Sequence, residues 1–156
     1  MEGKEKVCSC FGHFEVAITE ELCARTSEAI DEAIEEGVRI FLFGGRSNFD
    51  DLVYDLVSEE KAANSSLNLK RVFCFPLEKH LHKPPWWFVR KEYEHYACPT
   101  KAFDWWYTSI YYRNCAMIDQ SDMVLFYAEE RANSGAYKAY RYAVNARKKS
   151  VNFANQ

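Results

Sequence analysis

The sequence predicts an α/β protein with a Rossmann-like three-layer sandwich, in which a mostly parallel sheet lies between two layers of helices. Short apolar runs alternate along the chain with longer amphipathic segments. The apolar runs are nearly continuous, which is typical of parallel strands buried on both faces. A chain of 156 residues with 48% hydrophobic residues suits one domain with its own core. We therefore expect a single domain spanning residues 1–156.

The first half of the chain begins with two expected strands and the helix between them. The run Val7–Phe11 indicates a buried strand, and Gly12 marks the turn after it. Apolar residues at helical spacing predict a helix over Thr19–Glu36. The run Val38–Phe43 predicts the second strand, which leads into two consecutive glycines.

A second helix and a third strand follow, and then the alternation stops. Phe49–Glu60 has the spacing of an amphipathic helix, and Arg71–Phe75 that of a strand. Residues from about 80 to 108 form an insert after strand three that is too aromatic for a solvated linker. We expect it to pack on the core, on a partner subunit or on a ligand. Its tryptophans are Trp86, Trp87, Trp105 and Trp106.

The alternation resumes after the insert. We expect a helix over Ser109–Gln120, a strand over Met123–Tyr127, a helix over Ser134–Arg147 and a short strand over Ser150–Phe153. The predicted order is therefore β-α-β-α-β, the insert, and then α-β-α-β.

Charge and cysteine content exclude several classes of protein. The net charge of −3 and the pI of about 5.8 argue against binding to extended nucleic acid. Residues 1–60 carry 15 acids and 5 bases, whereas residues 61–156 carry 8 acids and 15 bases, so the second half suits a small anion. No apolar run is long enough for a membrane span, and Met1–Lys6 is too charged for a secretory signal. The six cysteines lack zinc-ribbon spacing, so we expect free thiols in the cytoplasm, no metal and no cofactor.

In an open parallel sheet, ligands bind beyond the carboxyl ends of the strands. Four sequence features fall at this edge: the turn after strand one, the glycine-rich turn after strand two, the aromatic insert, and the small-residue turn before the last long helix. The candidate ligand-binding residues are Gly12, His13, Phe14, Gly44, Gly45, Arg46, Asp50, Arg113, Asn114, Ser134, Gly135 and Ala136.

Each feature also has a structural interpretation. The turn from Ser134 to Ala136 fits a phosphate site at a helix N-terminus, and it fits an ordinary N-cap equally well. Gly44 to Ser47 suits either an anion-binding nest below Arg46 or a flexible turn. Asp50 suits a helix cap or a ribose contact. The four tryptophans suit base stacking, and they also suit a core or a dimer interface.

A resemblance to a known family rests on four motifs in order. The stretch Arg113–Asp122, R-N-C-A-M-I-D-Q-S-D, resembles the R-K-x-x-M-x-x-x-[AS]-D motif of the Lonely-guy phosphoribohydrolases. The whole chain is more similar to the YpsA-like branch of the SLOG (SMF/DprA–LOG) superfamily, which comprises small bacterial and phage proteins. The further motifs are Gly12-His13-Phe14, the turn from Gly44 to Asp50, and Ser134-Gly135-Ala136.

This resemblance implies a pocket for a nucleotide-derived molecule. Proteins of the SLOG group bind nucleotides or nucleotide-derived signals, including ADP-ribose-type messengers of antiviral defence. Lonely-guy enzymes instead cleave the N-glycosidic bond of nucleoside monophosphates, with an arginine and a glutamate that follows the phosphate loop. Here Tyr137–Arg141 follows the small-residue turn and contains no acid, so we expect that the protein is not such a hydrolase.

Three functional hypotheses follow. The first is binding of a nucleotide-derived small molecule, such as a cyclic nucleotide or an ADP-ribose-type signal, with sequestration of a defence signal as one form. In this hypothesis Arg46 and Arg113 pair with phosphates. The alternatives are an N-glycosidase that uses Glu15, Asp50 or Glu130, and an interaction protein with a vestigial pocket. Because large exposed aromatic patches are rare in monomers, we also expect a homo-oligomer.

Overall fold

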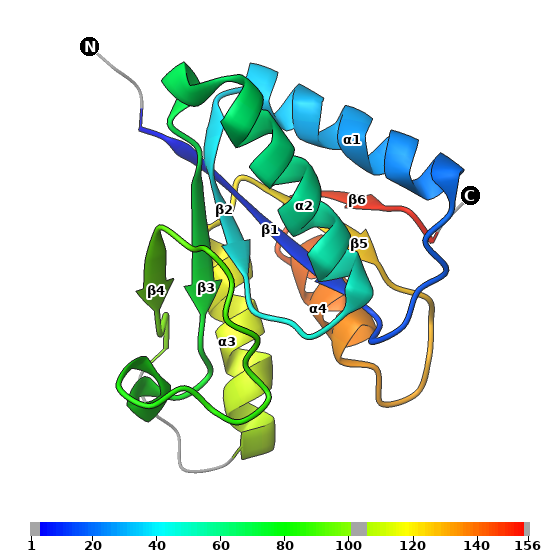
Figure 1. Cartoon of the computed structure of the whole chain (residues 1–156). Coiled ribbons are helices and arrows are strands. Elements are labelled where there is room, and N and C mark those ends of the chain that lie inside the picture. Colours follow the sequence, from blue (N-terminus) through cyan, green and yellow to red (C-terminus); the bar gives the residue numbers. More distant parts are fainter. Residues whose placement is uncertain (1–3, 101–105, 155–156) are drawn as a thin grey trace.

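A six-stranded parallel sheet forms the centre of the molecule, in the order β4-β3-β2-β1-β5-β6 (Figure 1). The structure is a computed structural model that describes residues 4–100 and 106–154, and of residues 106–108 it describes only the backbone. The strands are β1 (Lys6–Gly12), β2 (Val38–Phe43), β3 (Lys70–Cys74), β4 (His95–Ala97), β5 (Met123–Tyr127) and β6 (Lys149–Asn152). The predicted Rossmann-like α/β fold is confirmed.

Two layers of helices cover the sheet. Helices α1 (Glu20–Glu35) and α2 (Asn48–Ala63) lie on the near face in Figure 1, and α3 (Trp106–Gln120) and α4 (Gly135–Asn145) lie behind the sheet. Two short 3-10 turns, η1 (Ser65–Leu67) and η2 (Glu78–Leu81), flank β3. The helices begin where side chains can cap them, because Thr19 Oγ1 accepts from the Leu22 N–H and Ser47 Oγ from the Asp50 N–H.

Each face of the sheet has its own apolar core. Ile30 and Ala33 of α1 and Val53 of α2 pack on one face, with Phe41 of β2. Met117 of α3 and Ala139 of α4 pack on the other. Burying each large apolar side chain contributes about 1.5–3 kcal/mol. The two cores thus fix the sheet between its two layers of helices.

The insert after β3 differs from the sequence prediction in one respect. It contains β4, which adds a parallel strand to the edge of the sheet beside β3. Three residues with no clear pattern give too short a signal for a strand to be predicted. Two aromatic rings of the insert, Phe88 and Tyr93, pack on Phe73 of β3, so the insert packs on the core, as one of the expected alternatives stated.

The six cysteines are free thiols, four of them buried. Desolvation by burial raises the pKa of the Cys8 and Cys10 thiols well above the ordinary value. No helix in the described part of the chain is long and apolar enough to cross a membrane.

Candidate functional site

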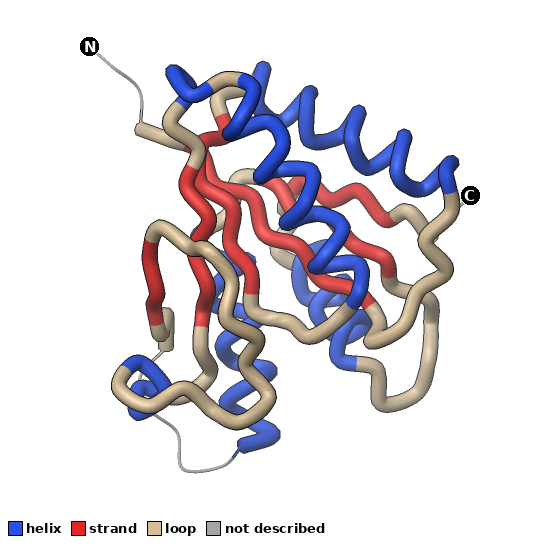
Figure 2. Tube along the Cα trace, in the orientation of Figure 1, coloured by secondary structure: helices blue, strands red, loops and turns tan. Residues whose placement is uncertain are grey.

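Strand β1 lies between β2 and β5, and this arrangement creates a crevice at one edge of the sheet. From β1 the chain builds β2, β3 and β4 on one side, and it returns on the other side with β5 and β6. The order reverses at β1, so the loops after β1 and β5 diverge there. Figure 2 shows that both loops lie at the same edge of the sheet, at the carboxyl ends of the strands.

A hollow of 370 Å³ occupies this crevice. We call it the helix-end hollow because the N-terminus of α4 forms one of its walls. The loops after β1, β2 and β5 form the others. Its lining residues are Gly12, His13, Phe14, Arg46, Ser47, Arg131, Ala132, Ser134, Gly135 and Ala136.

The start of α4 presents backbone N–H groups to this hollow. Ser134 is the N-cap, and its Oγ accepts from the Tyr137 N–H at 3.0 Å, which confirms the N-cap interpretation. The N–H groups of Gly135 and Ala136, in the first turn, have no partner within the helix. A Cβ added at Gly135 would have no atom within 4 Å. The space before the helix is therefore open, and the helix dipole favours an anion there.

His13 fixes the loop that leads into α4. Its Nε2 lies 2.7 Å from the backbone nitrogen of Glu129, whose N–H it accepts, and its Nδ1 lies 3.3 Å from Ser134 Oγ. Burial, together with the nearby positive charge of Arg131, lowers the pKa of His13. The ring is therefore neutral near pH 7, and its proton lies on Nδ1 because Nε2 is an acceptor.

Arg46 stands between the helix-end hollow and a second, smaller one. Its guanidinium carbon lies 5.7 Å from the ring centre of Phe14, 5.4 Å from that of Trp86 and 5.8 Å from that of Trp87. Among the residues that the structure describes, no carboxylate forms an ion pair with Arg46. Trp86 is 89% exposed and Phe14 64% exposed. An accessible, unpaired cation thus borders both hollows.

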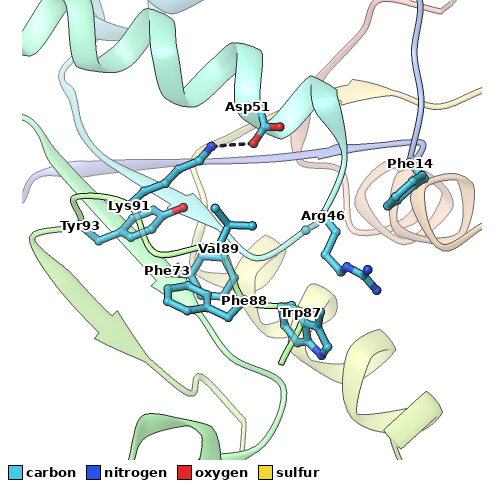
Figure 3. Close-up of a pocket in the computed structure, with 10 residues that line it drawn as sticks. Phe14, Arg46, Asp51, Phe73, Trp87, Phe88, Val89, Lys91 and Tyr93 are labelled. Carbon is cyan, nitrogen blue, oxygen red and sulfur yellow. Dashed lines mark hydrogen bonds and ion pairs between the residues drawn. The ribbon is translucent and has the colours of Figure 1, made fainter. Parts of the chain in front are cut away.

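We call the second space, of 210 Å³, the aromatic hollow (Figure 3). Rings from β3 and from the insert form much of its wall. On the α2 side, the Lys91 ammonium lies 2.6 Å from a carboxylate oxygen of Asp51. The lining residues are Phe14, Gly45, Arg46, Asp51, Phe73, Trp87, Phe88, Val89, Lys91 and Tyr93. Of the four tryptophans predicted from the sequence, Trp87 lines this hollow and Trp86 covers Arg46. Trp105 lies outside the described residues, and of Trp106 only the backbone is described.

Asp50 holds the loop that carries Arg46. Its carboxylate accepts from the Gly45 N–H at 2.8 Å and from Ser47 Oγ at 3.1 Å. Desolvation by burial raises the pKa of Asp50 to about 6, despite these hydrogen bonds and the nearby Arg113. The N-cap of α2 is Ser47, so the cap that the sequence suggested for Asp50 belongs to a residue three positions earlier.

Three of the four glycines predicted for the site have close neighbours at the position where a side chain would be. A Cβ at Gly12 would lie 2.6 Å from the Phe49 Cβ, and one at Gly45 would lie 2.4 Å from Asp50 Oδ2. A Cβ at Gly44 would lie 3.0 Å from Arg113 Cζ. Internal packing is therefore sufficient to explain glycine at these three positions. Of the four glycines predicted for the site, only Gly135 has open space where its side chain would be.

Arg113 and Asn114 of α3 lie behind the loop after β2. The Arg113 guanidinium donates to the carbonyl oxygens of Gly44, at 2.6 Å, and Cys74, at 3.4 Å, and to Asn114 Oδ1, at 2.9 Å. Burial lowers the pKa of Arg113. Neither residue belongs to the described lining of the two hollows. Their observed contacts hold the backbone at the ends of β2 and β3, and a phosphate contact for Arg113 stays a prediction.

Two residues that shape the crevice were not among the site residues predicted from the sequence. Arg131 lies in the loop after β5, and placing every charged residue between that strand and the next helix at the same edge would have found it. Asn48 was missed as well: its side chain donates to the Val16 carbonyl and accepts from the Val16 N–H, at 2.7 and 2.8 Å. This pair of bonds fixes the loop after β1, and a single asparagine gives no sequence signal for it.

Comparison with known proteins tests the fold alone. No protein-family model and no curated protein matches the chain. Among solved structures, the chain is similar to the DNA processing protein A (DprA) from Streptococcus pneumoniae. The TM-score is 0.52 at 10% identity, over 94% of this chain and 49% of that one. The chain has a DprA-like fold. The match covers about half the length of that protein. The shared fold accounts for the layers described above but not for the residues of the crevice.

Proposed function

We propose that this protein binds a nucleotide-derived small molecule across the carboxyl edge of its sheet. The observation that carries the proposal is the position of Arg46, an accessible and unpaired cation that lines both hollows. A ligand with an anionic group and an aromatic group needs two such neighbouring environments. Nucleotides and ADP-ribose-type molecules have this composition.

The anionic group would occupy the helix-end hollow. There the N–H groups at the start of α4 and the guanidinium groups of Arg46 and Arg131 favour negative charge. Arg131 forms an ion pair with Glu129, so Arg46 would be the stronger contact. Arginine suits this role because its planar group can donate two hydrogen bonds to one phosphate.

The aromatic group would occupy the aromatic hollow. Phe88, Trp87 and Tyr93 offer ring faces and edges, and base–aromatic stacking contributes about 1–3 kcal/mol per base. A nucleobase there and a phosphate beside α4 would place the sugar next to Phe14 and Arg46. Sequestration of a defence signal is the form of this function in which the ligand is held and released intact.

Thermal melting with a ligand panel tests the proposal. The panel is AMP, ADP-ribose, cyclic ADP-ribose and cyclic dinucleotides, and each ligand that raises the melting temperature is recovered and its mass measured. A ligand at 100 times its Kd stabilises the fold by about 2.7 kcal/mol. Arg46→Gln should abolish the shift, whereas the exposed Arg90→Gln, outside both hollows, should retain it. A recovered base would indicate hydrolysis, and no shift with any ligand would overturn the proposal.

A further inference from the structure

A third hollow lies between the outer faces of α3 and α4, and it begins at the first turn of α4. Its volume is 480 Å³. We call it the tyrosine groove. Its lining residues are Tyr111, Tyr137, Lys138, Arg141, Tyr142 and Asn145.

The tyrosine groove combines exposed rings with positive charge. Tyr111 is 38% exposed and lies edge-on to both Tyr112 and Tyr142. In the described part of the chain, no carboxylate forms an ion pair with Lys138 or Arg141. Tyrosine and arginine are enriched where proteins contact other proteins.

The exposed apolar residues beside the groove extend the same surface. Tyr112 is 45% exposed and Val144 is 47% exposed. Both lie on the helices that form the groove, and Val144 follows Arg141 by three residues on α4. The surface therefore has an apolar and aromatic centre with two cations, and it fits a partner whose surface is acidic.

The opposite layer of the molecule has a surface of that kind. The outer stripe of α1 contains only acids among its charged, exposed residues: Glu20, Glu21, Glu28, Asp31, Glu32 and Glu35. Glu28 and Glu32 are four residues apart, as are Asp31 and Glu35, so like charges face each other along the helix. The C-terminal end of α1 already has cationic partners, because Arg39 donates to the Ile34 carbonyl and Lys149 pairs with Glu36. A cationic partner would relieve the repulsion along the stripe itself.

We propose that the tyrosine groove of one copy binds the acidic outer stripe of α1 from a second copy. The charge complementarity of the two surfaces supports this occupant. The two surfaces lie on opposite layers of the sheet (Figure 1), so the contact is heterologous, with each copy offering a groove to one neighbour and a stripe to another. Association then extends beyond a dimer into an open stack of copies. It uses none of the residues that line the two hollows at the carboxyl edge, so it can be tested apart from the proposed ligand.

Sedimentation velocity over a range of protein concentrations tests this proposal. In 50 mM NaCl the average mass should rise with concentration beyond that of a dimer, and in 500 mM NaCl it should fall towards that of the monomer. The double variant Lys138→Glu/Arg141→Glu should weaken association at least tenfold, and so should Glu28→Lys/Glu32→Lys. Lys79→Glu/Lys83→Glu, on the far insert, is the matched control and should associate like the unmodified protein.

Mixing the two defective variants gives the decisive result. The reversed groove of one variant should bind the reversed stripe of the other, and their unaltered surfaces should bind each other, so the mixture should associate again. Circular dichroism melting of each variant shows whether it is folded. A monomer under all conditions, or association that neither double variant changes, would overturn the proposal.

Discussion

The imidazole of His13 accepts a hydrogen bond at Nε2 from the backbone N–H of Glu129, across a distance of 2.7 Å. This bond joins the loop after β1 to the loop after β5, which are separated by 116 residues in the sequence. It also sets the position of Ser134, whose hydroxyl lies next to Nδ1 of the same ring. One side chain therefore fixes two walls of the helix-end hollow.

Replacing His13 with phenylalanine should cost stability. The Glu129 N–H would lose its partner while remaining part-buried, and such a loss costs about 1–3 kcal/mol. Urea unfolding at pH 7.5 measures the change. His13→Gln, which offers a carbonyl oxygen as acceptor, is the control and should lose less stability than His13→Phe. Equal stability of the unmodified protein and His13→Phe would show that this bond contributes nothing.

The same residue predicts a dependence on pH. Burial and Arg131 lower the pKa of His13 in the folded protein below the ordinary value of 6.5, although Glu129 acts against this. The unfolded chain therefore binds a proton more readily, and the stability that His13 contributes is complete above pH 6.5 and is lost as the pH falls. The stability difference between the unmodified protein and His13→Gln should shrink from pH 7.5 to pH 5.5. A difference that grows on acidification would contradict this assignment.

Asp50 should show the opposite dependence. Burial raises its pKa from 3.8 to about 6, which corresponds to about 3 kcal/mol of stability. The folded protein binds this proton more readily, so the contribution is present below pH 3.8 and is lost as the pH rises to about 6. The surrounding groups are Cys10, Ser47, Asp51 and Arg113. Relative to Asp50→Asn, the unmodified protein should lose stability from pH 4 to pH 7, as measured by urea unfolding. A constant difference would refute the raised pKa.

Two glycine substitutions should separate packing from ligand binding. Gly12→Ala places a methyl group 2.6 Å from the Phe49 Cβ, and such overpacking costs about 1–3 kcal/mol. Gly135→Ala meets no atom within 4 Å, so it should leave the fold intact and stabilise it by about 0.4–1 kcal/mol. The new methyl group would stand before α4 and should weaken binding of an AMP-type ligand at least tenfold. Unchanged binding by Gly135→Ala in calorimetry would place the anion elsewhere.

Removing the guanidinium of Arg113 should loosen the loop that carries Arg46. Arg113→Met retains the apolar length of the side chain but leaves the carbonyl of Gly44 without its donor at 2.6 Å. We expect a loss of about 1–3 kcal/mol in stability and faster amide exchange at Gly45, measured by mass spectrometry. Arg39→Met is the control. Arg39 lies on β2, the strand that Gly44 follows, and its loss removes hydrogen bonds to the Ile34 and Val38 carbonyls. This variant should leave exchange at Gly45 unchanged.

Much of the fold could be predicted from the sequence, because strands such as Val38–Phe43 are continuous apolar runs and α1 has helical spacing between clear end signals. The edge strand β4 could not be predicted, because three residues have no detectable period. The positions of Gly12, His13, Arg46 and Gly135 around one crevice also followed from the sequence, since the carboxyl ends of parallel strands meet at one edge.

The contacts inside the site could not be predicted in the same way. The sequence does not show that Arg113 turns inward to two carbonyl groups, or that Gly45 faces a carboxylate. Both depend on how α2 and α3 pack against the loop after β2. A motif indicates which residues reach an edge, whereas packing decides which of them face the solvent.

The central place of β1 has a consequence for how the chain folds. Its contact with β2 closes after about 30 residues, since Cys8 lies opposite Phe41, but its contact with β5 joins Cys8 to Met123. Non-local pairings of this kind form late, because a long loop must close first. As the chain leaves the ribosome, β1 to β4 can assemble while one side of β1 still has unpaired backbone groups. The crevice lies along this last seam to close, so a molecule bound there would tie the early half of the domain to the late half.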